Sequence, residues 1–184
     1  MKRRDFVRSV GAFAALPLAG TLVAPAELLG RADKGGRAVK GQDRQDWEPL
    51  EKSKEEWKRI LTPEEFAVLR KEDTERANSS PLNEETRTGT YICAGCFLPL
   101  FSSDTKFKSG TGWPSFTAPI EGHMDTKRDF KLIWPRTEYH CARCGGHQGH
   151  VFDDGPEPTG QRWCNNGVAL DFVPEGQELP ELRQ

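Results

Sequence analysis

The sequence predicts a mainly β protein: a compact antiparallel β domain with short helices at its N-terminal side. The first observation is an abundance of turn residues, since the 184 residues include 18 glycines and 13 prolines, which leaves little room for long helices. The second is a set of short apolar runs between residues 91 and 173, separated by Gly, Pro and Asp as in sheets of short strands. The third is a mean hydropathy of −0.70, which excludes a bundle of membrane spans.

The first 26 residues predict an export signal that is not part of the fold. A basic segment (1–8) precedes an apolar segment rich in small residues (9–23), and an Ala-Pro-Ala sequence ends at Ala26, where cleavage is expected. The adjacent Arg3 and Arg4 favour the twin-arginine route. An amphipathic helix and an uncleaved membrane anchor are the alternatives. We therefore expect a periplasmic or otherwise exported protein that meets a membrane only transiently, through its signal.

Residues 27–50 predict a flexible linker, because they are rich in glycine and charged side chains and hold few core formers. The domain itself is expected over residues 51–175. A helix is predicted to begin at Thr62–Glu65, which combines a capping threonine, a proline at the first helical position and a glutamate at the third. Phe66 and Leu69 then fall on one face of this helix.

Five apolar runs predict the strands of the domain. They are Tyr91–Ile92, Phe97–Phe101, Phe130–Trp134, His150–Phe152 and Val168–Val173. Turn residues separate these runs, which is the pattern of a compact antiparallel domain. The last residues, 176–184, form a polar tail that is expected to be loose.

Four of the five cysteines form two C-x-x-C pairs: Cys93 with Cys96, and Cys141 with Cys144. Two thiolates three residues apart can bind one ion, and two such pairs complete a tetrahedral site. The sequence therefore predicts one structural Zn²⁺ per chain, with no open position for a catalytic water. Two disulfides are an alternative in an oxidising compartment. A thioredoxin-type redox pair is another, although the strand–helix–strand pattern that it needs is missing.

Cys164 is the fifth cysteine, and an unpaired cysteine is either a buried, inert thiol or a reactive one. Arg162 lies two residues before it and can share its strand face, where a positive charge favours the thiolate. His147 and His150 stand among glycines directly after the second cysteine pair. Trp113 lies on a glycine-rich turn and is either an exposed aromatic wall or a core residue. The coincidence of these residues indicates a thiol-based catalytic site.

Three segments resemble the B-type methionine sulfoxide reductases, which are peptide-methionine (R)-S-oxide reductases. They are GTGWPSF (110–116), HQGHVFDDGP (147–156) and GQRWCNNGVAL (160–170). With the two C-x-x-C pairs, the similarity runs from about Leu61 to Val173. It implies a domain of two small antiparallel sheets with a structural zinc site. It also implies the reduction of R-configured methionine sulfoxide, protein-bound or free, to methionine.

The resemblance also implies roles for individual residues. Cys164 matches the nucleophile, which attacks the sulfoxide sulfur and becomes a sulfenic acid. His147 and His150 match the candidates for the group that gives a proton or hydrogen bond to the sulfoxide oxygen. The other matches are Asn166, which lines the site, Arg162, which supports the thiolate, and Trp113, against which the substrate methyl group packs.

The chain departs from this family at several positions. Many members carry a second, resolving cysteine where Thr111 stands here, so we expect the sulfenic acid to react directly with an external thiol from a thioredoxin-like partner. Four further departures are expected at the rim of the pocket: Gln148 for Leu, Trp163 for Tyr, Asn165 for an aliphatic residue and Gly167 for Ser. We expect them to affect rate and substrate range rather than reaction type.

Two other classes of function compete with a reductase. A zinc-ribbon module that binds nucleic acid would need a basic excess, but the formal net charge is −2 and becomes more negative without the signal. A non-catalytic zinc-bearing β domain would bind a partner protein or act as a chaperone, and Cys164 would then be dispensable. We expect a monomer whose partners are oxidised proteins or peptides and a thiol reductant, with no nucleic acid.

Overall fold

The computed structural model describes residues 47–130 and 135–184. The expected signal (1–26) and most of the expected linker (27–46) lie outside the described residues. Within the described part, no helix has the length and apolar character that crossing a membrane requires.

Two short helices open the described chain, and both begin at a complete capping box. Helix α1 covers Lys54–Ile60 and is capped by Ser53, and helix α2 covers Pro63–Lys71 and is capped by Thr62. Glu65 N donates to the Thr62 hydroxyl (3.2 Å), and Thr62 N donates to the Glu65 carboxylate (2.8 Å). The predicted start of this helix is therefore confirmed, and its physical basis is the reciprocal capping of free backbone N–H groups.

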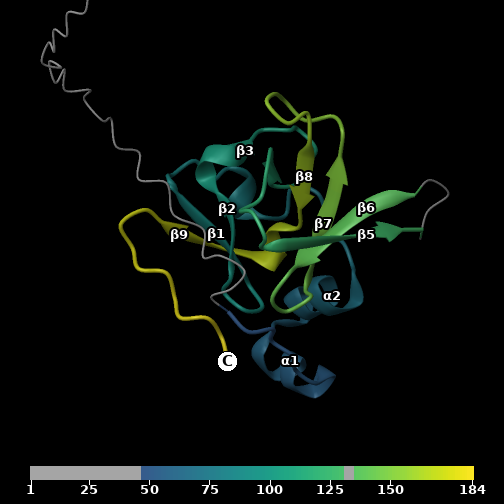
Figure 1. Cartoon of the computed structure of the whole chain (residues 1–184), viewed down its shortest axis with the longest axis vertical. Coiled ribbons are helices and arrows are strands. Elements are labelled where there is room, and N and C mark those ends of the chain that lie inside the picture. Colours follow the sequence, from purple (N-terminus) through teal and green to yellow (C-terminus); the bar gives the residue numbers. More distant parts are fainter. Residues whose placement is uncertain (1–46, 131–134) are drawn as a thin grey trace, which may run out of the picture. The chain divides into compact units, whose positions relative to one another are not determined.

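The strands form two antiparallel sheets (Figure 1). The smaller sheet has the order β2-β1-β9, with β2 at Pro99–Ser102, β1 at Gly89–Cys93 and β9 at Leu170–Pro174. The larger sheet has the order β3-β4-β8-β7-β6-β5. Its strands are β3 (Lys106–Phe107), β4 (Ser115–Phe116), β8 (Arg162–Asn165), β7 (His147–Phe152), β6 (Arg136–Cys141) and β5 (Met124–Asp129). Single 3-10 turns lie at Pro81–Asn83 (η1), Ser103–Thr105 (η2) and Gly167–Ala169 (η3). The predicted fold class is confirmed.

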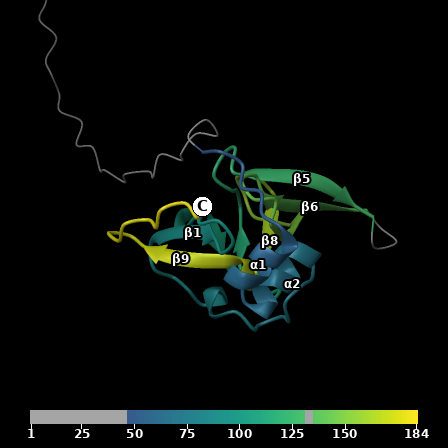
Figure 2. The same ribbon diagram turned by 90° about the horizontal axis from the view of Figure 1, so that it is seen from below.

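An aromatic core joins the two sheets. The ring centroid of Tyr91 on β1 lies 5.0 Å from that of Phe116 on β4, and Phe101 on β2 stacks on Phe116 at 4.0 Å. Helix α2 buries Phe66 and Leu69, the two residues predicted to share a face, and packs against β7 and η3. Helix α1 in turn packs on α2 (Figure 2). The helices therefore cover the part of the larger sheet that carries the histidines.

The observed strands differ from the expected ones at two places. Phe97 has a left-handed backbone (φ 66°) in the turn after Cys96, and the strand expected to include it begins only at Pro99. Phe130 follows the end of β5 and is 71% exposed, and the remainder of that expected run (131–134) lies outside the described residues. Strand β5 is formed instead by a largely polar segment, which carries no apolar signal.

Both ends of the described chain pack against the domain, whereas a loose linker and a loose tail were expected. Trp47 and Leu50, at the end of the expected linker, contact the hydrophobic core. In the tail, Leu182 packs against the same core, and Arg183 N donates to Cys96 O (3.1 Å). Apolar side chains and a backbone hydrogen bond therefore hold these terminal segments to the domain.

Candidate active site and metal centre

Two turns of the same design carry the paired cysteines. Cys93 ends β1 and Cys141 ends β6, so each C-x-x-C pair lies in the turn that leaves a strand. Phe97 N donates to Cys93 O and Gly145 N donates to Cys141 O, both at 2.8 Å. Phe97 and Gly145 both have left-handed backbones, with φ of 66° and 67°. One turn belongs to each sheet, so a ligand shared by the two turns would connect the sheets.

The four sulfur atoms lie within 4.8 Å of one another, and all four side chains are buried. Cys93 Sγ lies 3.8 Å from Cys144 Sγ, and Cys96 Sγ lies 3.5 Å from Cys141 Sγ. These distances far exceed the roughly 2.05 Å of a disulfide bond. They are close to the separation of about 3.8 Å expected for thiolates around an ion with metal–sulfur bonds of about 2.3 Å. The donor set therefore fits one thiophilic divalent ion, and the cysteines are not arranged as two disulfides.

Cys164 lies on β8 in a row of residues that crosses the larger sheet. The strand register pairs Ser115 with Cys164, Cys164 with His150, His150 with Glu138, and Glu138 with Lys127. Directly opposed residues of antiparallel strands point to the same face of a sheet. The row therefore brings a thiol, an imidazole and a carboxylate from three separate strands to one face.

The close approach of β7 and β8 depends on the glycine between the two histidines. A Cβ at Gly149 would lie 1.9 Å from the Cys164 carbonyl oxygen, so no side chain fits at this position. Because Gly149 lets the strands approach, His150 lies directly opposite the thiol.

A small cavity of about 130 Å³ opens at Cys164. Four of the predicted site residues line it together: Cys164, His150, Asn166 and Trp113. The indole of Trp113 is therefore a cavity wall rather than a core residue. The other two predicted residues, His147 and Arg162, are not part of this wall and lie in the structure that supports it.

Burial raises the pKa of the Cys164 thiol above its usual range, and the nearby Arg162 guanidinium and Thr111 hydroxyl oppose that shift. Arg162 is held in place by Asp154, whose carboxylate accepts from Arg162 Nε (2.8 Å) and Nη2 (2.9 Å). The thiol is therefore protonated at neutral pH, with a fixed positive charge beside it that stabilises the thiolate once it forms.

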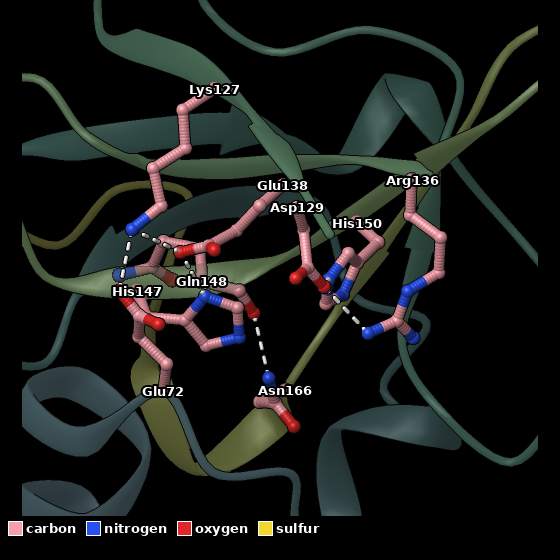
Figure 3. Close-up of polar contacts among 9 residues, drawn as sticks. All are labelled: Glu72, Lys127, Asp129, Arg136, Glu138, His147, Gln148, His150 and Asn166. Atoms are coloured by element: carbon pink, nitrogen blue, oxygen red, sulfur yellow. Dashed lines mark hydrogen bonds and ion pairs between the residues drawn. The ribbon is translucent and has the colours of Figure 1, made fainter. Parts of the chain in front are cut away.

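His150 is the imidazole in the cavity wall, and a carboxylate orients it (Figure 3). His150 Nε2 lies 3.0 Å from Asp129 Oδ2, to which Arg136 Nη2 also donates (2.7 Å). Burial lowers the pKa of His150, and Asp129 opposes this shift. At neutral pH the ring is therefore uncharged, and when Nε2 donates to Asp129 the other nitrogen, Nδ1, can accept a proton.

His147 is 2% exposed, and its ring centroid lies 5.5 Å from that of His150. Its Nδ1 lies 2.8 Å from Glu138 Oε1, and Glu138 forms an ion pair with Lys127 at 3.3 Å (Figure 3). Lys127 also pairs with Glu72, so the network reaches the surface. Burial lowers the pKa of His147. The neutral ring donates Nδ1–H to Glu138, and its buried Nε2, which has no hydrogen-bond partner among the described residues, remains an acceptor.

Asn166 and Trp113 are held by the same residue, Glu75, in the loop that follows α2. Glu75 N donates to Asn166 Oδ1 (3.1 Å), and Trp113 Nε1 donates to Glu75 O (3.2 Å). Asn166 Nδ2 also donates to Gln148 O (3.0 Å; Figure 3). The side-chain amide and the indole in the cavity wall are therefore fixed by backbone groups on either side.

Of the residues expected at the rim of the pocket, Gln148 is an interior residue instead, and Asn165 lines the small cavity at Cys164. Gln148 and Asn165 are both fully buried, and Asn165 Nδ2 donates to Gln148 Oε1 (3.1 Å). Gln148 Nε2 donates to Cys93 Sγ (3.4 Å), and Tyr139 OH donates to Asn165 Oδ1 (2.9 Å). A continuous polar network therefore runs from a cysteine of the metal centre to the strand of the nucleophile.

The other two departures have different surroundings. A Cβ at Gly167 would lie 2.0 Å from Ser80 Oγ, so the close packing of Ser80 leaves no room for a side chain at position 167. Trp163 is half-buried, its Nε1 donates to Gln161 Oε1 (3.2 Å), and its ring centroid lies 4.9 Å from that of Tyr139. Neither residue lines the small cavity at Cys164.

Several polar residues that support the site were missed in the sequence analysis: Glu75, Asp129, Arg136, Glu138 and Asp154. Asp154 lies within the motif HQGHVFDDGP and could have been found there. Asp129 and Arg136 become neighbours through the pairing of β5 with β6, a register that no motif in the sequence marks. Glu75 lies in a loop far from the nucleophile in sequence, so only the fold shows its contacts.

The two sheets, the four-cysteine group and the separate thiol opposite an imidazole define a class of thiol-dependent β proteins with a cysteine cluster that fits a metal ion. The SelR domain family matches residues 61–174 of the chain. The peptide methionine sulfoxide reductase MsrB of Bradyrhizobium diazoefficiens is 54% identical over 125 residues, which cover 67% of this chain and 90% of that protein. The protein of the same name from Methanosarcina barkeri is 53% identical over 127 residues, covering 68% of this chain and 89% of the relative. The chain belongs to the SelR domain family, that of the B-type methionine sulfoxide reductases.

Proposed function

We propose that this protein reduces R-configured methionine sulfoxide, in proteins or free, to methionine, with Cys164 as the nucleophile. The observation that carries the proposal is that the five cysteines have two different environments. Four are buried together in the metal centre, and Cys164 is half-buried and lines a cavity, together with an imidazole, an amide and an indole. The membership of the SelR domain family supports the same reaction.

The first half-reaction transfers one oxygen atom from sulfur to sulfur. The Cys164 thiol gives its proton to Nδ1 of His150, and the thiolate attacks the sulfur of the sulfoxide. The attack forms a sulfur–sulfur bond, and the substrate oxygen receives the proton from the imidazolium. In the rearrangement that follows, this oxygen forms a bond to the Cys164 sulfur while the substrate's sulfur–oxygen bond and the new sulfur–sulfur bond break, which leaves a sulfenic acid on Cys164. The substrate sulfur gains two electrons and leaves as methionine, and the cysteine sulfur loses two.

The remaining residues of the site stabilise this step without exchanging atoms with the substrate. The Arg162 guanidinium favours the thiolate, because its positive charge opposes the rise in the pKa of Cys164 that burial causes. Asn166 and Trp113 bound the cavity, where the amide can bind the polar sulfoxide group and the indole can pack against its methyl group. His147, which lies behind His150, acts through the orientation and charge of its neighbour.

The second half-reaction requires an external thiol. A thiol of a thioredoxin-like partner attacks the sulfenic acid, releases water and forms a mixed disulfide with Cys164. A second thiol of the donor then reduces that disulfide and restores the Cys164 thiol. An external donor is proposed because Thr111, not a cysteine, lies beside Cys164, and because the other four cysteines are buried in the metal centre.

The ion that best suits the metal centre is Zn²⁺, which prefers four thiolates in a tetrahedral arrangement. Cys93, Cys96, Cys141 and Cys144 would hold one ion per chain and leave no position open for a substrate. The ion would connect turns from both sheets and stabilise the fold.

The export of the protein is also part of the proposal. Residues 1–26 would act as a twin-arginine signal, residues 27–46 would follow as a linker, and the monomeric enzyme would work in the periplasm or otherwise outside the cytoplasm. Because the twin-arginine route carries folded proteins, the metal could be bound before export. The N-terminal sequence of the exported protein tests this part.

A direct test compares the wild type with Cys164→Ser, a nearly isosteric change. With dithiothreitol as donor, the wild type is expected to reduce the R epimer of a methionine sulfoxide peptide and to leave the S epimer, and Cys164→Ser is expected to be inactive with unchanged metal content. Full activity of Cys164→Ser would exclude the mechanism. An inactive wild type with a full metal complement would favour the alternative, a non-catalytic domain that binds a partner or acts as a chaperone.

A further inference from the structure

A single loop residue, Glu75, contacts three parts of the chain that meet at the site. Its backbone N–H bonds to Asn166 Oδ1 (3.1 Å), and its backbone carbonyl accepts from Trp113 Nε1 (3.2 Å). Its carboxylate accepts from the backbone N–H groups of Gly167 and of Val168 (3.0 Å to the latter). Two of these contacts reach residues of the cavity wall, and the other two reach the 3-10 turn directly after Asn166.

The carboxylate and the backbone of Glu75 have separate tasks in this arrangement. The carboxylate caps two backbone N–H groups of η3, which lack partners within their own turn. That bond sets the distance between the loop after α2 and the chain at Asn166. At this distance, the backbone N–H and carbonyl of Glu75 can form their hydrogen bonds with the Asn166 amide and the Trp113 indole. Removing the carboxylate therefore loosens both cavity residues without touching either of them.

Glu75 also borders a larger cavity, which has a volume of about 670 Å³ and is bounded by Gly167 and Val168 as well. Thr74, the residue before Glu75, borders both this cavity and the small cavity at Cys164. The loop that carries Glu75 is therefore part of the wall of the site, and the four hydrogen bonds of Glu75 connect it to the residues on either side.

We propose that Glu75 is a positioning residue for sulfoxide reduction, which acts by holding Asn166 and Trp113 against the substrate. This inference rests on the proposed function. It requires no contact of Glu75 with the substrate, the thiol or either histidine. Small displacements of groups that position a substrate have large effects on rate, so the effect on catalysis should exceed the effect on folding.

The test compares Glu75→Gln and Glu75→Ala with Glu65→Gln. The amide of Gln can accept one of the two backbone hydrogen bonds, so kcat/KM for an R-sulfoxide peptide should fall roughly 10-fold in Glu75→Gln and roughly 100-fold in Glu75→Ala. Glu65 is the matched control, because its carboxylate also caps a backbone N–H and lines the same larger cavity but contacts neither Asn166 nor Trp113. Glu65→Gln should keep the wild-type kcat/KM.

Two further readouts separate positioning from a loss of structure. The rate of alkylation of Cys164 without substrate should be unchanged in Glu75→Gln, since the thiol is not contacted. Glu75→Gln combined with Asn166→Ala should lose less activity than the sum of the two single losses, because part of the effect of Glu75→Gln acts through Asn166. Wild-type kcat/KM in Glu75→Gln, or strictly additive losses in the double variant, would overturn the proposal. An inactive wild type would instead refute the proposed function on which it rests.

Discussion

Asn165 Nδ2 donates to Gln148 Oε1 at 3.1 Å in the interior of the domain. These two residues were singled out in the sequence as separate departures from the family, and the fold makes them direct neighbours on β7 and β8. Each also has a second partner, Cys93 Sγ for Gln148 and the Tyr139 hydroxyl for Asn165. The pair therefore forms one buried hydrogen-bond network, which reaches Cys93 at one end and Tyr139 at the other.

The first prediction concerns this pair. Gln148→Leu or Asn165→Val alone should each lower the free energy of unfolding by about 1–3 kcal/mol, because either change leaves a buried polar group without its partner. The double variant should lose less than the sum of the two, since it removes both polar groups of the shared hydrogen bond. Urea unfolding of the metal-loaded proteins measures this. Strictly additive losses would show that the two side chains are energetically independent.

The second prediction concerns the reactivity of the nucleophile. The rate of Cys164 alkylation by iodoacetamide should rise with pH and reach its midpoint above that of an ordinary thiol, because burial raises its pKa. Arg162→Ala and Thr111→Val should each move this midpoint to still higher pH, since both side chains lower the pKa of Cys164. Cys164→Ser provides the background rate. A midpoint below that of a free thiol would contradict the description of a half-buried, neutral thiol.

The third prediction concerns the buried imidazole behind the cavity. Burial lowers the pKa of His147 and Glu138 opposes that shift, so Glu138→Gln should lower the pKa of His147 further. The pKa of His150, whose hydrogen-bond partner is Asp129, should move less. Titration of the ring nitrogens by NMR gives both values in one experiment. An upward movement of the His147 pKa in Glu138→Gln would mean that the carboxylate does not act on this ring as described.

The fourth prediction separates the two kinds of cysteine. Cys96→Ser should lower both the zinc content and the melting temperature, because the ion would tie together turns from both sheets. Cys164→Ser is the matched control and should change neither, since its sulfur lies outside the cluster. Metal analysis and calorimetry of the two variants are sufficient. Equal zinc content and equal melting temperature in the two variants would contradict the structural role assigned to the metal centre.

The parts of the structure that the sequence predicts correctly are those whose signals are local. The capping box of α2 lies within four residues, Thr62–Glu65, and each cysteine turn is a four-residue motif with its own geometry. The four predicted residues in the cavity wall come from motifs that contain a rare side chain: a cysteine, a histidine, an asparagine two residues after the cysteine, and a tryptophan. Such residues stand out without knowledge of the fold.

The parts that were missed depend on contacts between distant segments. The polar strand β5 is stabilised by its pairing with β6, so its own side chains carry no apolar pattern. Leu182 lies in a polar tail, and a single apolar residue is too weak a signal to predict docking. Glu75 supports the site through one side-chain group and two backbone groups, and backbone hydrogen bonds leave no mark on residue type.

The packed tail has a practical consequence for the handling of this protein. Arg183 bonds through its backbone N–H to Cys96 O (3.1 Å), accepts from Arg143 Nη1 at its carbonyl (2.8 Å), and places its guanidinium 4.4 Å from the Phe97 ring centroid. Arg183 thus contacts residues of both cysteine turns. A purification tag fused after Gln184 would compete with these contacts, so a fusion at the opposite terminus, removed by cleavage ahead of Trp47, is the safer arrangement for preparing the domain with its cysteine turns undisturbed.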